Sequence, residues 1–318
     1  MPKKGLGVDV LSAAKQRISW TFDEFDKIYC SFSAGKDSGV MTHLVCQEAR
    51  KRGRKIGLFF LDWEAQFTLT IEFAKSIYAE YADCIDPYWV SVPIKTWNAV
   101  SVYEPEWTAW DESKKNLWVR QPDPISVTNT DIFPFWYDGI MFEEFVPTFG
   151  QWYAKGEKCA CFVGIRAQES LNRFRTLARD KPMYDGRPYT TNVVENVWNV
   201  YPIYDWNTED IWTFHGKTGC SHNKLYDRMH QAGMTIHQMR ICEPFGDESR
   251  KGLWLYQIVE PSIWARLVMR VNGANTGKMY SNERGNVMGN HTISLPAGHT
   301  WQSFAVSLLN SIPPKTSE

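Results

Sequence analysis

The stretch Ser31-Phe32-Ser33-Ala34-Gly35-Lys36-Asp37-Ser38 decides which fold the rest of the chain must form. A short β-prone run, 27–32, leads into this stretch, and apolar residues at helical spacing, 39–52, follow it. A loop of small residues between a strand and a helix N-terminus directs several backbone N–H groups at one point, where the helix dipole adds positive potential. The stretch is therefore predicted to be a phosphate-binding loop.

The residues of this loop have the chemistry that a phosphate needs. Ser33 and Ser38 supply hydroxyl groups, Lys36 supplies a positive charge, and Gly35 leaves room for close approach. Asp37 can hold a Mg²⁺ ion that bridges phosphates. The loop is not a Walker A sequence, which requires G-x-x-x-x-G-K-[ST], because an aspartate follows the lysine. The alternative interpretation is a solvated turn between a strand and a helix.

Outside the loop, β-prone runs alternate with helical patterns. The expected strands are 27–32, 55–61, 88–92, 160–165 and 197–201, and the helices among them are 10–25, 39–52, 68–81, 167–178 and 208–214. This order predicts an α/β fold with a doubly wound parallel sheet and right-handed crossovers.

Two parts of the chain depart from that alternation. Residues 95–158 are dense in Trp, Tyr, Phe, Pro and Asp, and we interpret them as an inserted lid or substrate-facing segment. Late in the chain helical patterns dominate, at 223–232, 250–259, 262–271 and 304–309. We therefore expect a nucleotide-binding domain over residues 1–215, with the insertion inside it, and a mostly helical C-terminal region over 216–318.

Composition excludes several classes of protein. Of 318 residues, 43% are hydrophobic and 22% are charged, which is typical of a globular protein. A formal net charge of −1 argues against a dedicated nucleic-acid coat or a membrane-surface protein. The basic run 51–55 leaves a local nucleic-acid contact open, with a solvated helix end as the alternative. No apolar run is long enough to span a membrane.

The cysteines point to a reducing compartment. Seven are present, an odd number, and no secretory signal precedes them, so we expect free thiols and a cytoplasmic protein. His215, Cys220, His222 and Cys242 have the side chains of a zinc site, but their spacing matches no zinc pattern, which favours structural roles.

Three segments carry a resemblance to a known family. The opening stretch resembles the PP-loop of the ATP pyrophosphatase superfamily, in the version of its phosphoadenosine phosphosulfate (PAPS) reductase branch. The segment 163–170, Val-Gly-Ile-Arg-Ala-Gln-Glu-Ser, resembles the Gly-x-Arg-x-x-x-Ser segment of that branch. The segment 201–212 resembles its Pro-Ile-x-x-Trp-x-x-x-Asp-Val-Trp segment. The stretch 238–275 is similar to uncharacterised bacterial and phage PAPS reductase-like proteins. The family usually has glycine where this chain has Ala34.

The resemblance implies an adenine nucleotide α-hydrolase-like fold that binds ATP or PAPS with Mg²⁺. It implies catalytic roles for Lys36, Asp37 and Arg166, with the metal on Asp37. An arginine at a helix start can grip phosphate in a fork, so we expect Arg166 to point into the same cleft as Lys36. The nucleotide-binding residues expected are Ser33, Ala34, Gly35, Lys36, Asp37, Ser38, Asp62, Glu64, Gly164, Arg166, Ser170 and Arg173.

Alternatives remain for some of these residues. Asp62 and Glu64 can be solvated acids at a strand end, and Arg166 can form a surface salt bridge with Glu169. The segment 201–212 is more typical of a structural than of a catalytic element.

The family's thiol chemistry lacks its usual residues here. Thiol-dependent reductases of this fold use a cysteine near the C-terminus in a Glu-Cys-Gly-x-His setting, and no cysteine follows Cys242. The cysteine pairs that hold an iron–sulfur cluster in related reductases are absent too, so no such cluster is expected. Cys159 and Cys161 form a lone pair inside a predicted strand.

Three functions follow as hypotheses. The first is cleavage of the α–β phosphate bond of ATP, with adenylation of an unidentified acceptor and release of pyrophosphate. The second is reduction or sulfur transfer from a sulfonucleotide, as in PAPS reductase. The third is a non-catalytic nucleotide sensor that acts with a ParB-like protein, a partner that the resemblance suggests.

Overall fold

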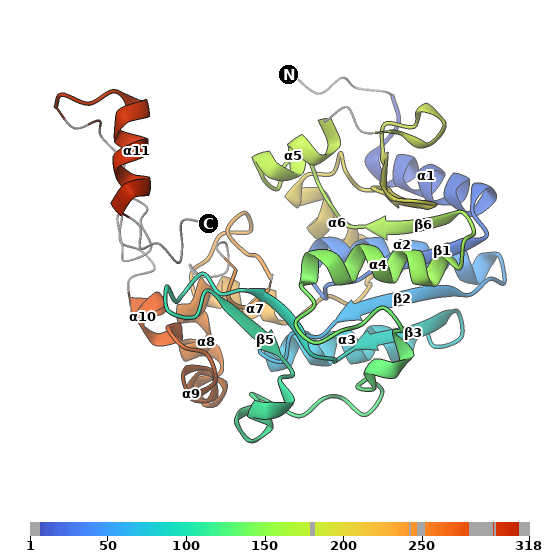
Figure 1. Cartoon of the computed structure of the whole chain (residues 1–318). Helices are drawn as coiled ribbons and strands as arrows, with labels where there is room; N and C mark the ends of the chain where they lie inside the picture. Colours follow the sequence, from blue (N-terminus) through green and yellow to red (C-terminus); the bar gives the residue numbers. More distant parts are fainter. Residues whose placement is uncertain are drawn as a thin grey trace.

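The central element is a single twisted sheet (Figure 1). The computed structural model describes residues 7–178, 182–241, 243–246, 252–279, 295 and 297–311. Within them the sheet has the strand order β3-β2-β1-β6-β8-β7. Its strands are β1 (Lys27–Ser31), β2 (Ile56–Leu61), β3 (Ile85–Val90), β6 (Cys159–Val163), β7 (Thr190–Val194) and β8 (Val197–Val200).

Most neighbouring strands run parallel, as the sequence predicts. β1 pairs in parallel with both β2 and β6, β2 pairs in parallel with β3, and β6 pairs in parallel with β8. The edge strand β7 pairs antiparallel with β8. From the sequence no strand is expected at 190–194, and this edge strand is antiparallel because a hairpin joins β7 to β8 through a turn at Asn196 (φ 61°) rather than a crossover helix.

Helices cover both faces of the sheet. Side chains alternate along a strand, so Ile28 and Cys30 of β1 pack into one hydrophobic cluster while Tyr29 packs into the other. The first cluster is closed by α1 (Val10–Glu24), α2 (Lys36–Lys51), α3 (Thr68–Glu80) and α6 (Thr208–Thr218). The second is closed by α4 (Phe142–Ala154), which crosses in front of the strands in Figure 1.

This arrangement is doubly wound. From β1 the chain proceeds outward to β2 and β3, and it then returns to place β6 on the other side of β1. The strand order therefore reverses between β1 and β6, and ligands of such sheets bind in the crevice at the carboxyl ends of the two strands. The predicted phosphate loop follows β1, and Gly164 and Arg166 follow β6, so both segments lie at this switch point.

The interpretation of residues 95–158 as one insertion was wrong in its last part. A hairpin of β4 (Ile94–Trp97) and β5 (Glu106–Ala109) and the short 3₁₀ helices η1 (Glu112–Leu117) and η2 (Thr130–Ile132) come first. The helix α4 that follows is the crossover to β6, and its Phe145 and Phe149 are fully buried. Pro147 within the helix and the many aromatic residues hid its periodicity.

The C-terminal helices pack on the same hydrophobic cluster as α4. They are α7 (Leu225–Gln231), α8 (Leu253–Val259), α9 (Pro261–Arg270) and α10 (Ala274–Met279), while α5 (Leu171–Ala178) and α11 (Trp301–Ser311) complete the described helices. The ring of Tyr256 stacks on Phe67 with a centroid distance of 3.6 Å. Among the described residues, no helix has the length and apolar character needed to cross a membrane.

A buried ion pair fixes the C-terminal helices to the end of β2. Glu64 is fully buried, and its carboxylate accepts hydrogen bonds from Nε of Arg270 at 2.8 Å and from a terminal nitrogen of Arg270 at 3.0 Å. The backbone N–H groups of Trp110 and Val119 donate to the same carboxylate at 2.7 and 3.1 Å. Glu64 is therefore neither a solvated strand-end acid nor free to contact a nucleotide.

Asp62 is also buried and paired with protein groups. Its carboxylate is 1% exposed, accepts from Nε1 of Trp89 at 2.8 Å and is paired with Arg120. The expectation that Asp62 and Glu64 face the nucleotide is corrected on this geometry, because all four carboxylate oxygens are engaged with protein donors.

Replacing Arg270 by methionine tests the importance of this ion pair. Arg270→Met keeps most of the side-chain volume but leaves Glu64 buried without its cation, which should lower the free energy of unfolding by about 3–5 kcal/mol. The control is Lys115→Met, because Lys115 and its partner Glu112 are 59% and 65% exposed. Urea denaturation should show a loss under about 1 kcal/mol for that exposed pair. Equally small losses of unfolding free energy in Arg270→Met and Lys115→Met would contradict the claim that the Glu64–Arg270 ion pair fixes the C-terminal helices.

Candidate phosphate-binding site

The loop after β1 is a tight turn that leads into the N-terminus of α2, and hydrogen bonds between Ser33 and Ser38 close it. The Oγ atoms of Ser33 and Ser38 lie 2.9 Å apart, and the N–H of Ser33 donates to Oγ of Ser38 at 3.2 Å. Gly35 is the N-cap of α2 and offers no side chain to the amides of the first turn. Those amides and the dipole of the helix therefore create a site suited to an anion.

Ala34 has a backbone conformation that favours glycine. Its φ is 57°, in the left-handed region, and its side chain is fully buried. A left-handed residue with a Cβ costs roughly 1–2 kcal/mol, and alanine is the smallest such residue. Ala34, which stands where the family usually has glycine, is thus the residue of this loop with a left-handed backbone conformation.

A buried carboxylate joins two cations at the head of α2. Oδ1 of Asp37 lies 2.5 Å from Nε of Arg166, and Oδ2 lies 3.3 Å from Nζ of Lys36. The exposed fractions of Lys36, Asp37 and Arg166 are 5%, 9% and 2%. The structure thus brings Arg166 and Lys36 together at one carboxylate, as the sequence predicts. The alternative, a surface salt bridge with Glu169, is wrong, since Glu169 pairs instead with Arg173.

Gly164 lets β6 approach the loop closely enough for this contact. A Cβ atom at Gly164 would lie 2.9 Å from both the Cα and the backbone nitrogen of Ser38, a distance that real Cβ atoms do not show. The guanidinium of Arg166 is held from its other side, because it donates to the carbonyl of Trp206 at 3.4 Å and to Oγ1 of Thr208 at 3.5 Å.

Two further predicted residues lie at the N-terminal end of α5 rather than in the loop, Ser170 just before the helix and Arg173 within it. Oγ of Ser170 accepts the backbone N–H of Arg173 at 3.2 Å, so it caps the first turn of that helix. The side chain of Arg173 is 49% exposed and pairs with Glu169 at 3.9 Å. Within the described part of the chain, neither residue forms a hydrogen bond or ion pair with residues 33–38.

The C-terminal segment supplies contacts to the loop that sequence reasoning missed. The hydroxyl of Tyr226 accepts the backbone N–H of Lys36 at 2.9 Å. Nζ of Lys36 donates to the carbonyl of Met239 at 3.1 Å, and Nδ2 of Asn223 donates to the carbonyl of Ala34 at 3.0 Å. About 190–200 residues separate the partners in sequence, and an asparagine and a tyrosine near a short helix carry no sequence signal of such a contact.

The Mg²⁺ ion expected on Asp37 does not fit this arrangement. Each oxygen of the carboxylate already faces a cation, Arg166 on one side and Lys36 on the other. A divalent ion bound to either oxygen would lie next to a like charge. Among the described residues, no group of three or more metal-ligating side chains is present. Asp37 therefore orients the two cations, and no protein-held Mg²⁺ is assigned.

Each histidine considered for a zinc site has one ring nitrogen within hydrogen-bonding distance of a protein oxygen, while Nε2 of His215 is buried with no hydrogen-bond partner among the described residues. Nδ1 of His215 lies 3.1 Å from the carbonyl oxygen of Cys220, and Nε2 of His222 lies 2.9 Å from Oδ1 of Asp227. Burial lowers the pKa of His215 to about 4, so the ring is neutral at neutral pH. The fourth candidate ligand, Cys242, lies outside the described residues.

Most of the described thiols are buried. Cys30, Cys46, Cys84, Cys159 and Cys161 are all buried, and Cys220 is partly exposed. Burial raises the pKa of Cys30 and of Cys159 to about 12. A thiol must form an accessible thiolate to act as a nucleophile, and these two do not.

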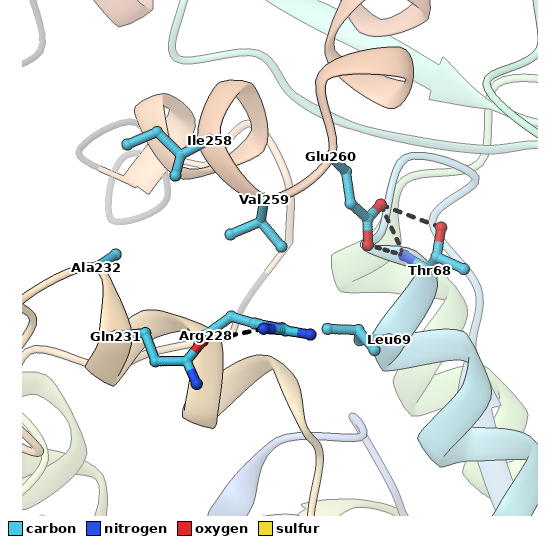
Figure 2. Close-up of a pocket in the computed structure, with 8 residues that line it drawn as sticks. All are labelled: Thr68, Leu69, Arg228, Gln231, Ala232, Ile258, Val259 and Glu260. Atoms are coloured by element: carbon cyan, nitrogen blue, oxygen red, sulfur yellow. Dashed lines mark hydrogen bonds between the residues drawn. The ribbon is translucent and has the colours of Figure 1, made fainter.

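A cavity lies beside α7 (Figure 2). Its volume is about 510 Å³, and the N-terminus of α3, helix α7 and the junction of α8 and α9 line it. Glu260 closes one side by accepting the N–H of Thr68 at 2.9 and 3.0 Å. Figure 2 shows Arg228 extending from α7 towards Leu69, with Nη1 donating to Gln231 at 3.0 Å.

Comparisons with solved structures show distant likenesses. A Candida auris PAPS reductase in a phosphate complex is 16% identical with a TM-score of 0.39, over 68% of this chain and 84% of that one. Candida glabrata FMN adenylyltransferase with ATP is 17% identical with a TM-score of 0.40, over 68% and 57%. Francisella tularensis NMN synthetase is 11% identical with a TM-score of 0.38, over 92% and 100%.

Comparisons with sequences are closer. The uncharacterized Escherichia coli protein YbdN is 43% identical over 317 residues, which are 98% of this chain and 78% of that protein. Residues 233–318 match a domain of unknown function, DUF3440. The phosphoadenosine phosphosulfate reductase domain matches residues 27–248, a range that includes the whole sheet, the loop and the Tyr226 contact. The chain therefore belongs to the phosphoadenosine phosphosulfate reductase domain family.

Proposed function

We propose that this protein binds ATP or a closely related adenine nucleotide at residues 33–38 and transfers its adenylyl group to an acceptor, with release of pyrophosphate. The observation that carries this proposal is the buried set of Lys36, Asp37 and Arg166 at the switch point of the sheet. Two cations and the N-terminus of a 16-residue helix converge there, which is the electrostatic environment that a pyrophosphate group requires.

Each residue has a role in the proposed reaction. A nucleophilic oxygen or nitrogen of the acceptor bonds to the α-phosphorus while the bond to the bridging oxygen of the β-phosphate breaks. Lys36 and the hydroxyl groups of Ser33 and Ser38 hold the leaving pyrophosphate, and Arg166 stabilises the charge that grows on the α-phosphate. Asp37 keeps the two cations in place. We propose a cytoplasmic protein whose partners are the nucleotide and this acceptor.

The family description favours a second candidate, reduction or sulfur transfer from PAPS. That reaction needs a thiolate that attacks sulfur. Five of the described cysteines are buried, which disfavours them as nucleophiles, and Cys242 is the remaining candidate late in the chain. A nucleotide-sensing role with a ParB-like partner rests on the resemblance alone and is the third candidate.

Removing the loop lysine should weaken nucleotide binding. Lys36→Ala deletes a charge-assisted phosphate contact, so calorimetry with ATP should show a loss of roughly 1.5–3 kcal/mol of binding free energy. The control is Lys115→Ala, because Lys115 is 59% exposed on η1 and should leave binding unchanged. Equal affinity of Lys36→Ala and wild type would remove the loop from the nucleotide site.

The backbone of Ala34 gives an independent test of the loop. Ala34→Gly should retain nucleotide binding and raise the free energy of unfolding by about 1 kcal/mol, because glycine accepts a positive φ without strain. Ala34→Val should abolish binding, since a β-branched side chain does not tolerate this conformation. Asn196→Gly, also at a positive φ (61°) but in the β7–β8 turn, should leave binding unchanged. Normal binding by Ala34→Val would show that the loop does not cradle phosphate.

Product analysis distinguishes adenylyl transfer from ATP, the first candidate, from reduction or sulfur transfer from PAPS, the second. We predict no sulfite from PAPS in the presence of thioredoxin and a reductant, because serine and lysine cannot form the thiosulfonate that releases sulfite. Pyrophosphate should appear from ATP once the acceptor is supplied. The control is Cys242→Ser in the same sulfite assay. Steady sulfite production that is lost in Cys242→Ser would establish the reductase function instead.

A further inference from the structure

The phosphate-binding groups of the loop are already occupied by the protein itself. We define the cover as residues 223–241, the segment that contains α7 and ends at Ile241. The hydroxyl of Tyr226 accepts a hydrogen bond from the backbone N–H of Lys36, and the carbonyl of Met239 accepts one from the ammonium group of Lys36. The side-chain amide of Asn223 donates to the carbonyl of Ala34. The side chains of Asn223 and Tyr226 are 0% and 2% exposed, so these contacts are sealed from solvent.

The hydroxyl of Tyr226 has the position of a phosphate oxygen. It is an acceptor 2.9 Å from the first amide of α2, which is the atom that an anion at a helix N-terminus would bind. A Cβ atom added to Gly35 would lie 3.4 Å from the same hydroxyl, so the phenol also fills the space that the glycine leaves open. The ammonium group of Lys36 lies 5.5 Å from the centre of the Tyr226 ring.

From these contacts we infer that Tyr226 is a gate residue of the nucleotide site, and that the cover must release the amide of Lys36 before pyrophosphate can bind there. This inference rests on the proposed function. It makes the described structure the closed state of the site, in which a phenol oxygen competes with the ligand for one backbone donor. Nucleotide binding then includes the free energy of opening the cover, which reduces the observed affinity.

Helix α7 has room to move on its other side. Tyr226 and Arg228 are two positions apart, about 200° around the helix, so they point in opposite directions. Tyr226 contacts the loop, while Arg228, Gln231 and Ala232 line the cavity of about 510 Å³ in Figure 2. A shift of α7 towards this cavity would withdraw the hydroxyl from Lys36, and it would carry the buried side chains of Leu225 and Met229 with it.

The test compares wild type with Tyr226→Phe, using inorganic pyrophosphate and ATP as ligands in calorimetry. Phenylalanine keeps the ring but removes the oxygen, so pyrophosphate no longer competes for the amide and its Kd should fall about two- to tenfold. The matched control is Tyr153→Phe, because the hydroxyl of Tyr153 also accepts a backbone N–H, that of Gly57 at 3.0 Å, near the start of β2. Tyr153→Phe should leave the Kd unchanged.

The outcomes separate this inference from the proposed function. If wild type binds pyrophosphate and Tyr226→Phe binds it equally or more weakly, the gate is wrong while the phosphate site stands. If neither protein binds pyrophosphate or ATP, the proposed function fails and the gate fails with it. Binding by Tyr226→Phe where wild type shows none would support both.

Hydrogen exchange of the wild-type protein gives a readout that does not depend on a variant folding. Pyrophosphate should slow exchange in peptides from the loop and speed it in peptides from the cover, because the cover leaves the loop as the ligand enters. Slower exchange in both segments would overturn the gate, since it would show that the cover closes on the ligand.

Discussion

The contact on which the site depends is the buried ion pair between Asp37 and Arg166. It joins the first turn of α2 to the segment after β6, and these two segments follow the strands between which the sheet reverses its order. The pair can form because Gly164 lets the backbone of β6 pass against Ser38. A buried carboxylate with one cation on each side holds both cations at fixed positions, so their placement is set before an anion arrives.

The sequence predicted the elements with strong local patterns and missed those defined by distant contacts. Strands β1, β2, β6 and β8 follow apolar runs and were expected within a few residues of their observed bounds. The helix α4 was missed because proline and aromatic residues obscure its period, although it closes one face of the sheet. In the site, the placement of Arg166 near Lys36 followed from the motif, whereas the roles of Glu64 and Tyr226 depend on partners about 200 residues away.

The C-terminal part of the chain contacts both the loop and the end of β2. Arg270 neutralises Glu64 at the end of β2, and the segment with Tyr226 closes the phosphate loop. The PAPS reductase domain and the domain of unknown function overlap in residues 233–248, which include Met239, the residue whose carbonyl accepts from Lys36. The contact between the C-terminal segment and the loop therefore lies where the two matched domains meet.

We propose that residues 33–38 bind the pyrophosphate portion of an adenine nucleotide. A crystal structure of the full chain soaked with ATP, beside one soaked with PAPS, tests it most directly. In the ATP-soaked crystal, the β- and γ-phosphates should lie within hydrogen-bonding distance of the Lys36 amide and the Ser38 hydroxyl. The α-phosphate should face Arg166, and Tyr226 should be displaced. Phosphates bound away from this loop, or occupancy by PAPS with none by ATP, would contradict it.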